Sequence, residues 1–163
     1  MPPQRRRKTP HVEPFHPPRF DASTQAEELV SYLDEHGYAV VSSVCSAADC
    51  VAAKSLLWEF LEAVPGTRVR RDDPGSWGHA DDWLPSPATG IIAGQGFGQC
   101  DFMWKLRLFP DVRRAFEAIW QTDDLLVSFD GGNAFRPWRN RPEWRTSGGW
   151  YRSRPPTSAQ TTS

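Results

Sequence analysis

The spacing of apolar residues predicts two amphipathic helices in the N-terminal half of the chain. Apolar positions recur at helical intervals within residues 24–36, and the sequence Thr-Gln-Ala-Glu at 24–27 has the form of a capping box. Gly37 follows, and glycine readily adopts the left-handed conformation that ends many helices. A second capping box, Ser-Ala-Ala-Asp at 46–49, begins a longer apolar pattern, so we predict a second helix over 46–64.

Apolar runs too short for helices predict strands. These runs lie at 38–41, 90–94 and 125–129. Residues 99–108 have a weaker helical pattern, and 110–121 is predicted as a clear amphipathic helix with proline at its first position. The stretch 67–89 lacks periodicity and is predicted as a long loop, while Asp-Gly-Gly-Asn at 130–133 predicts a turn.

Composition limits how much of the 163-residue chain can pack into a core. Hydrophobic residues make up 39% of the chain, which is below the average for soluble domains. The 15 prolines and 12 glycines are above the average for such domains. We therefore expect a disordered, basic, proline-rich tail over 1–22, an ordered domain over 23–151 and a disordered, polar tail over 152–163.

The net charge of −1 hides an uneven distribution of charged residues. Residues 1–22 carry a net charge of +3, residues 23–134 carry −9, and residues 135–163 carry +5. Basic ends can contact phosphates, but the acidic body argues against a nucleic-acid-binding domain. No apolar run approaches the roughly 20 residues that span a bilayer, and the N-terminus lacks the apolar stretch of a signal peptide, so we expect a soluble cytoplasmic protein with no membrane partner.

Several residue types that often carry chemistry lack the required context. Cys45, Cys50 and Cys100 match no zinc spacing and are expected as reduced thiols, without a nucleophilic role. The glycine-rich sequence at 94–98 lacks the further glycine, or the Gly-Lys-Ser/Thr, of a nucleotide loop, so a turn is the better interpretation.

The sequence also contains a possible pair of metal ligands. His79 and Asp81 have the His-X-Asp spacing of a facial iron triad, but the other three histidines all precede them. Two readings stay open: a metal site in a functional enzyme, or solvated loop residues, which we favour. The acidic pairs at 72–73 and 81–82 are likewise expected to be solvated rather than to bind a cation.

Eight tryptophans divide into two predicted groups. Three lie on helical patterns and are predicted in the core: Trp58, Trp104 and Trp120. Five are predicted at the surface or in a pocket: Trp77, Trp83, Trp138, Trp144 and Trp150.

Taken in order, several segments resemble the phytanoyl-CoA dioxygenase-like oxygenases. They are Gly-Tyr-Ala-Val-Val at 37–41, the helix ending in Phe60-Leu61, Asp-Pro-Gly-Ser-Trp at 73–77, Gly-Ile-Ile at 90–92, Phe-Glu-Ala-Ile-Trp at 116–120, and Asp-Leu-Leu-Val-Ser-Phe-Asp at 124–130 followed by Arg136-Pro137. The resemblance covers about residues 24–151 and only the N-terminal half of the family's domain.

This resemblance implies an α+β fold: an incomplete double-stranded β-helix, or jelly roll, with N-terminal buttressing helices. Complete members use Fe(II) and 2-oxoglutarate to oxidise a small organic substrate, and their iron is held by a His-X-Asp pair and a later histidine. In the family, the His-X-Asp pair comes directly after a sequence like the Gly-Gly-Trp-Tyr at 148–151. Here Arg152, Ser153 and Arg154 stand in those places, and a guanidinium has no lone pair for a metal.

We therefore interpret the chain as a truncated N-terminal portion of such an oxygenase, inactive alone and needing no cofactor itself. Candidate pocket residues are Trp104, Arg107, Asp130 and Arg136, with structural salt bridges or surface exposure as the alternative. The second interpretation is a non-catalytic binding or regulatory protein that contacts an unidentified protein partner through the aromatic, arginine-rich residues 135–151.

Overall fold

A computed structural model describes residues 15–78, 82–128 and 130–146 of the chain. The helices in these residues are α1 (Ala26–His36), α2 (Ala47–Glu62), α3 (Asp101–Arg107) and α4 (Pro110–Trp120), with short 3-10 turns η1 (Pro74–Gly78), η2 (Phe97–Gln99) and η3 (Pro142–Trp144). The strands are β1 (Ile91–Ile92) and β2 (Gly132–Asn133). The four predicted helices are confirmed.

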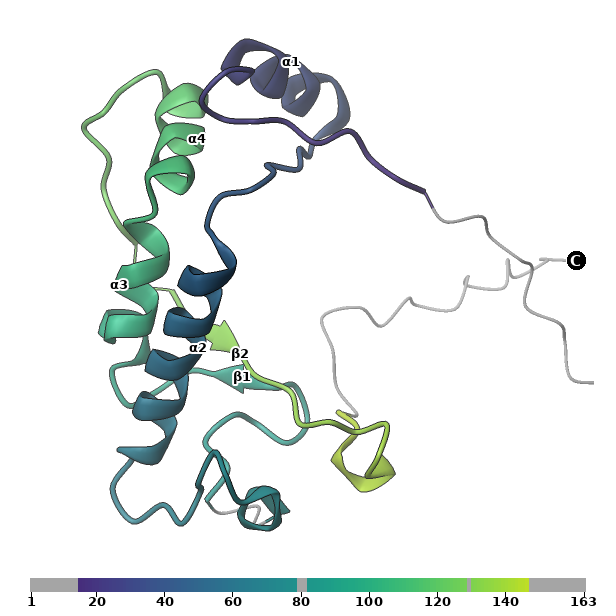
Figure 1. The fold of residues 1–163 in the computed structure, drawn as a ribbon, viewed down its shortest axis with the longest axis vertical. Coiled ribbons are helices and arrows are strands. Elements are labelled where there is room, and N and C mark those ends of the chain that lie inside the picture. The colour runs from purple at the N-terminus through teal and green to yellow at the C-terminus, as the bar shows by residue number, and fades with distance from the viewer. Residues whose placement is uncertain (1–14, 79–81, 129, 147–163) are drawn as a thin grey trace, which may run out of the picture.

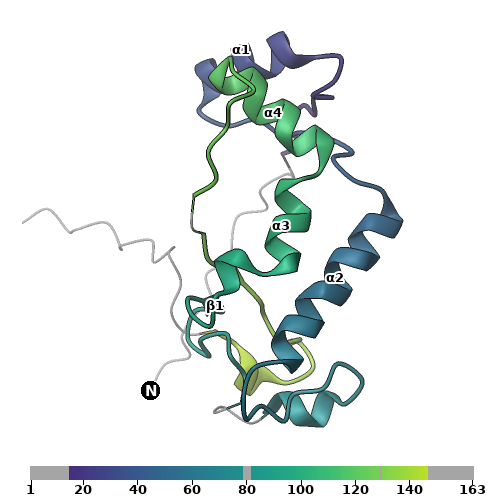
Figure 2. The same cartoon turned by 90° about the vertical axis from the view of Figure 1, so that its left-hand side faces the viewer.

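The helices form two packed pairs along an elongated molecule. The long helix α2 lies beside α3, and α1 packs against α4 at one end, whereas β1, β2 and the loops gather at the other end (Figures 1 and 2). None of the described helices is long and apolar enough to cross a bilayer.

The two predicted capping boxes have different outcomes. At α2 the box is confirmed, because the Ser46 hydroxyl accepts the Asp49 amide at 3.1 Å and the Asp49 carboxylate accepts the Ser46 amide at 3.2 Å. At α1 it is wrong: Gln25 is the N-cap and makes no side-chain cap bond. The Thr24 amide instead donates to the Asp21 carbonyl, so the residue belongs to the preceding turn. Gly37 ends α1 in the left-handed conformation, as predicted.

The predicted strands are found only in part. β1 lies within the predicted run at 90–94 and pairs antiparallel with β2, placing Ile91 opposite Asn133 and Ile92 opposite Gly132. The predicted turn at 130–133 is thus partly strand. The predicted strand at 38–41 is wrong, since it amounts to a parallel bridge between Phe20 and Val41. Phe20 itself is buried.

The predicted strand at 125–129 is wrong for residues 125–128, which adopt no regular structure, and residue 129 lies outside the described residues. A strand needs a neighbour for its backbone amides and carbonyls, and no described segment pairs with this one as a ladder. In the described residues the sheet has two strands, so the jelly roll stays a prediction.

The main core lies between the C-terminal half of α2 and the loops around β1. Its buried members are Leu61, Val69, Trp83, Ile92 and Phe97. This core corrects part of the tryptophan assignment, because Trp83 and Trp144 are buried whereas Trp104 and Trp120 are exposed. Their α3 and α4 positions face away from the core because no described segment covers that side.

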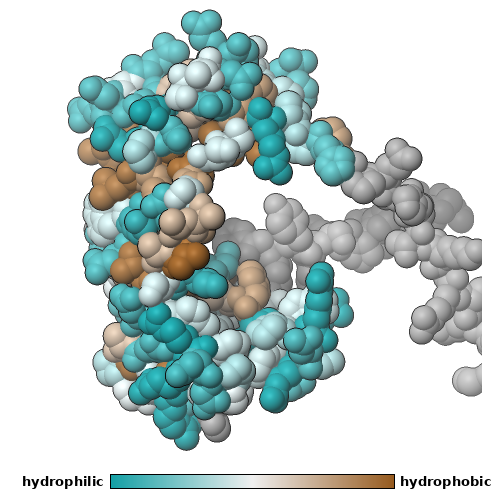
Figure 3. All heavy atoms as spheres, viewed as in Figure 1, coloured by the Kyte–Doolittle hydropathy of each residue, from teal (hydrophilic) through white to brown (hydrophobic). Residues whose placement is uncertain are grey.

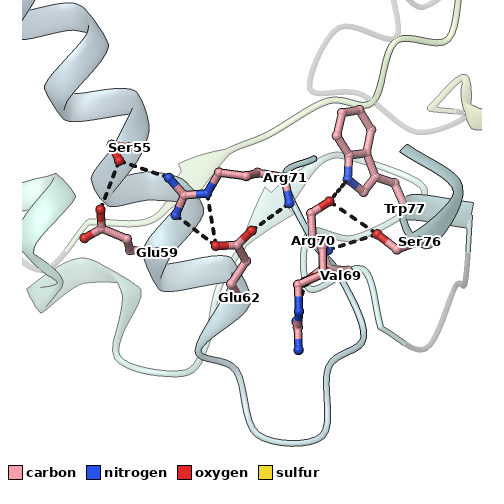
Figure 4. Close-up of polar contacts among 8 residues, drawn as sticks. All are labelled: Ser55, Glu59, Glu62, Val69, Arg70, Arg71, Ser76 and Trp77. Atoms are coloured by element: carbon pink, nitrogen blue, oxygen red, sulfur yellow. Dashed lines mark hydrogen bonds and ion pairs between the residues drawn. The ribbon is translucent and has the colours of Figure 1, made fainter. Parts of the chain in front are cut away.

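A polar network attaches the loop after α2 to the helix (Figure 4). The Arg71 side chain donates two hydrogen bonds to one Glu62 carboxylate oxygen, at 2.8 and 3.0 Å, and the Arg71 amide donates to the other oxygen at 2.6 Å. Arg71 also donates to the Ser55 hydroxyl, which donates to Glu59. The guanidinium beside Glu62 holds the pKa of that carboxyl below its usual value.

Apolar side chains remain exposed on the α3 and α4 side of the molecule, where Figure 3 shows hydrophobic groups among the hydrophilic ones. They include Leu108, Phe116, Trp120 and Leu126. Isolated exposed apolar residues are ordinary, but several large ones on neighbouring elements usually mark a contact surface.

Candidate functional site

An open hollow of about 660 Å³ lies where β1, the loop leading to α3 and the start of β2 meet. Five glycines line it: Gly94, Gly96, Gly98, Gly131 and Gly132. The lining residues with polar side chains are Gln99, Asp130 and Asn133. The hollow is therefore formed mostly by backbone and apolar groups, with a carboxylate at one side.

Three of the four pocket residues predicted from the sequence lie beside this hollow. Asp130 lines it, and an Arg107 nitrogen lies 3.7 Å from an Asp130 carboxylate oxygen. The Arg107 guanidinium also lies 5.3 Å from the centroid of the Trp104 ring. Trp104 and Arg107 are three residues apart on α3, a spacing that places both on one side of the helix.

The Arg107 side chain links α3 to two segments of backbone at the edge of the hollow. It donates to the Gly98 carbonyl at 2.7 Å and to the Ser128 carbonyl at 3.4 Å, and the Ser128 hydroxyl donates to Asp130 at 2.7 Å. The guanidinium and carboxylate therefore hold the loops in place. Because Arg107 is engaged with Asp130 and two carbonyls, its main role is to position the loops around the hollow rather than to bind a ligand by its charge.

Close contacts explain two of the glycines around the hollow. A Cβ atom added at Gly98 would lie 2.6 Å from the Asp130 carbonyl oxygen, and one at Gly132 would collide with the Phe97 ring. Gly94, in contrast, has no atom within 4 Å of an added Cβ. The sequence at 94–98 forms a turn, and its glycine spacing allows the chain to approach residue 130.

The fourth predicted residue, Arg136, lies in a different place. Its side chain is buried, donates to the Trp77 carbonyl at 2.9 Å, and lies 5.7 Å from the Trp83 ring and 5.2 Å from the Trp144 ring. Burial lowers the pKa of this guanidinium. Among the described residues no carboxylate lies within salt-bridge distance of it, so its charge is stabilised chiefly by aromatic faces and a carbonyl.

Further arginines continue this aromatic cluster outward. Arg141 lies over Trp144, and both Arg139 and Arg145 lie over Trp138, with charge-to-ring distances between 5.0 and 5.9 Å. Trp138 is 43% exposed. The segment thus presents stacked cationic and aromatic groups at the surface.

Metal binding finds little support in the described residues. His79 and Asp81 lie outside them, and no group of three or more His, Cys, Asp and Glu side chains in the described ranges is placed to hold a metal ion. Asp82 pairs with Arg68 at 2.6 Å, and the Asp73 carboxylate accepts the Gly75 amide. The Asp82 side chain is only 9% exposed, so the prediction that it is solvated is wrong, because it is paired with Arg68. Asp72 and Asp73 are exposed, as predicted.

The residues also do not fit the Fe(II) and 2-oxoglutarate that the family resemblance implies. The resemblance implies His-X-Asp ligands at the positions of Arg152, Ser153 and Arg154, and two permanent cations there would repel a metal ion.

Several contacts that organise the fold were not predicted from the sequence. No spacing in the sequence predicts the Glu62–Arg71 network or the burial of Trp83 and Trp144, because loops bring these residues to their partners. The one-turn spacing of Trp104 and Arg107 was a usable signal for that pair.

Comparison with known proteins gives a distant relative. The chain is 25% identical over 118 residues to a protein of Dictyostelium discoideum named "Putative phytanoyl-CoA dioxygenase". The similarity covers 71% of this chain and 33% of the relative, so the chain spans about a third of that protein's length. No family model matches the chain, and no solved structure matches it.

Proposed function

We propose that this chain is the N-terminal portion of a phytanoyl-CoA dioxygenase-like Fe(II)/2-oxoglutarate oxygenase and is inactive by itself. The observation that carries the proposal is the 118-residue similarity, which extends over most of this chain but only a third of the relative. The resemblance implies that the family's His-X-Asp ligands would stand at residues 152–154, where this chain has Arg152, Ser153 and Arg154.

The exposed apolar residues support the same proposal. In this proposal the helices α1 to α4 would form the buttress that the resemblance implies, and Phe116 and Trp120 of α4 are 50% and 67% exposed. In a complete oxygenase, further strands would form the jelly roll and cover such residues. The substrate would be a small organic molecule bound within that completed barrel.

The chemical test uses the purified full chain with Fe(II), 2-oxoglutarate and oxygen. We expect no one-to-one iron binding in calorimetry and no succinate release above a sample without protein. Weak adsorption of Fe(II) to surface carboxylates would not contradict this expectation, since isolated carboxylates bind hard cations loosely. Tight stoichiometric binding with turnover would show that the chain is an active enzyme; His79→Ala would then test the His79 and Asp81 alternative.

The genetic test is to sequence the transcript and the genomic locus across residue 152. We expect another reading frame, or sequence beyond an intron, to encode His-X-Asp directly after Tyr151 and a further histidine later. A locus without that coding sequence would contradict the truncation and favour the second function below.

The second candidate function is non-catalytic binding through the arginine and tryptophan groups of residues 136–145. The specific observation is the stacked surface set of Arg139, Arg145 and Trp138. A polyglutamate peptide should bind with an affinity that falls as salt is added, because exposed charges are screened. Replacing both arginines by glutamine should weaken binding about tenfold, whereas Arg113→Gln on α4 should not; equal binding by all three proteins would exclude this function.

A further inference from the structure

Two of the three cysteines meet at the start of α2. The Sγ atoms of Cys45 and Cys50 lie 3.4 Å apart, and both side chains are free thiols. Cys50 is exposed and Cys45 is half-buried, so small molecules can reach the pair. Cys100, the third cysteine, lies at the start of α3 and packs against the core.

The helix cap explains why these two thiols meet. Ser46 is the N-cap of α2, so Cys45 occupies the position before the cap and Cys50 the fourth helical position. Side chains at these two positions commonly contact each other across a capping box as a hydrophobic staple. Here the staple consists of two thiols, and the reciprocal Ser46–Asp49 bonds hold the turn between them.

We propose that Cys45 and Cys50 form a redox-sensitive dithiol that a low-molecular-weight disulfide, such as oxidised glutathione, converts to an intramolecular disulfide. This proposal is independent of the oxygenase proposal, because it needs only the α2 N-terminus. Its consequence is a covalent closure of that terminus beside the Asp49–Lys105 ion pair, which joins α2 to α3 at 3.7 Å.

The exchange proceeds in two balanced steps. The Cys50 thiolate attacks one sulfur of glutathione disulfide, forming a mixed disulfide and releasing one glutathione thiolate. The Cys45 thiol then loses its proton and attacks the Cys50 sulfur, which forms the protein disulfide and releases the second glutathione. The protein loses two electrons and two protons, and glutathione disulfide is reduced to two glutathione molecules.

The order of these steps follows from the surroundings of the two thiols. The hydrogen bond with Cys50, together with partial burial and the nearby Asp49 carboxylate, raises the pKa of Cys45. Cys50 is the more exposed of the two, so glutathione disulfide reaches its sulfur more readily than that of the half-buried Cys45. Cys50 is therefore the first nucleophile and Cys45 the resolving thiol.

The test incubates the purified full chain with excess glutathione disulfide, alkylates the remaining thiols and maps the peptides by mass spectrometry. We expect the peptide containing both cysteines to lose two hydrogens (about 2 Da) and to resist alkylation, while Cys100 stays alkylated. In the Cys45→Ser variant the reaction should stop at the mixed disulfide between Cys50 and glutathione. The Cys100→Ser variant should form the Cys45–Cys50 disulfide as the natural chain does.

A second measurement separates the folded geometry from mere closeness in sequence. The equilibrium between dithiol and disulfide is measured against glutathione in the folded chain, in urea and in the cap variant Ser46→Ala. The folded chain should favour the disulfide about tenfold over the urea-unfolded chain, because the cap raises the effective concentration of one thiol at the other. The proposal would be overturned if glutathione remained attached to both Cys45 and Cys50, or if either formed a disulfide with Cys100. It would also be overturned if the dithiol–disulfide equilibrium were the same in the folded and unfolded chain.

Discussion

The core beside α2 and the segment that follows α4 are both rich in apolar residues, but they differ in burial. Val69 and Ile92 each retain 1% of their possible exposure, whereas Leu126 is 96% exposed. At the core, α2, β1 and two loops approach from several directions. At residues 125–128, the described hydrogen bond to the helices comes from the Arg107 side chain of α3 to the Ser128 carbonyl. An apolar run is therefore buried only where other segments provide a surface to cover it.

The largest expected effect on stability is the contrast between one alanine substitution in the core and one in the segment after α4. Trp83→Ala should lower the free energy of unfolding by about 3–5 kcal/mol, because it removes a buried ring from the core. Leu126→Ala should change it by less than about 0.5 kcal/mol, since the side chain is already in solvent. Urea titration of both variants checks the contrast, and a large loss for Leu126→Ala would show that this segment is packed in solution.

The backbone contact at the hollow is tested by two glycine substitutions. Gly98→Ala should cost about 1–3 kcal/mol, because the new Cβ collides with the Asp130 carbonyl and separates residue 130 from η2. Gly94→Ala is the matched control, and it should change the stability by less than about 0.5 kcal/mol because its surroundings are open. Equal losses in thermal unfolding would contradict the described packing.

The two helix caps give a smaller contrast between two similar sequence motifs. Ser46→Ala should lower the free energy of unfolding by about 1 kcal/mol, because it removes an acceptor for the Asp49 amide. Thr24→Ala should have almost no effect, since Thr24 makes no side-chain cap bond at α1. Circular dichroism during urea unfolding measures the stability of both variants. A clear loss of stability in Thr24→Ala would show that the Thr24 side chain does cap α1.

The smallest expected effect is the pH dependence contributed by Glu62. Its folded pKa lies below the ordinary value of 4.5, chiefly because Arg71 donates hydrogen bonds to it. The stabilisation is therefore complete above pH 4.5 and is lost as the pH falls through the lower folded pKa. Glu62→Gln should reduce stability at neutral pH and flatten the acid part of the stability profile; an unchanged acid slope would show that the ion pair contributes nothing.

Much of the helical structure follows from local sequence signals. The Ser46–Asp49 box, the glycine after His36 and Pro110 at the start of α4 each favour one local conformation, and all three act as predicted. The Thr24 box failed because Asp21 forms a competing turn with the same backbone. Of the pocket candidates, Trp104 and Arg107 share a helix face that their spacing predicts, whereas the position of Asp130 beside Arg107 depends on how the distant loop folds back.

By itself, the sequence determined which four segments are helical, where α2 begins and where α1 ends, because caps, glycines and apolar spacing act over only a few residues. The tertiary structure alone decided which tryptophans are buried, that Arg136 lies between Trp83 and Trp144, and that Arg107 reaches two separate loops. These outcomes depend on contacts between residues far apart in the chain. Their free energy comes from burying surfaces and pairing polar groups that meet only after the helices and loops have packed.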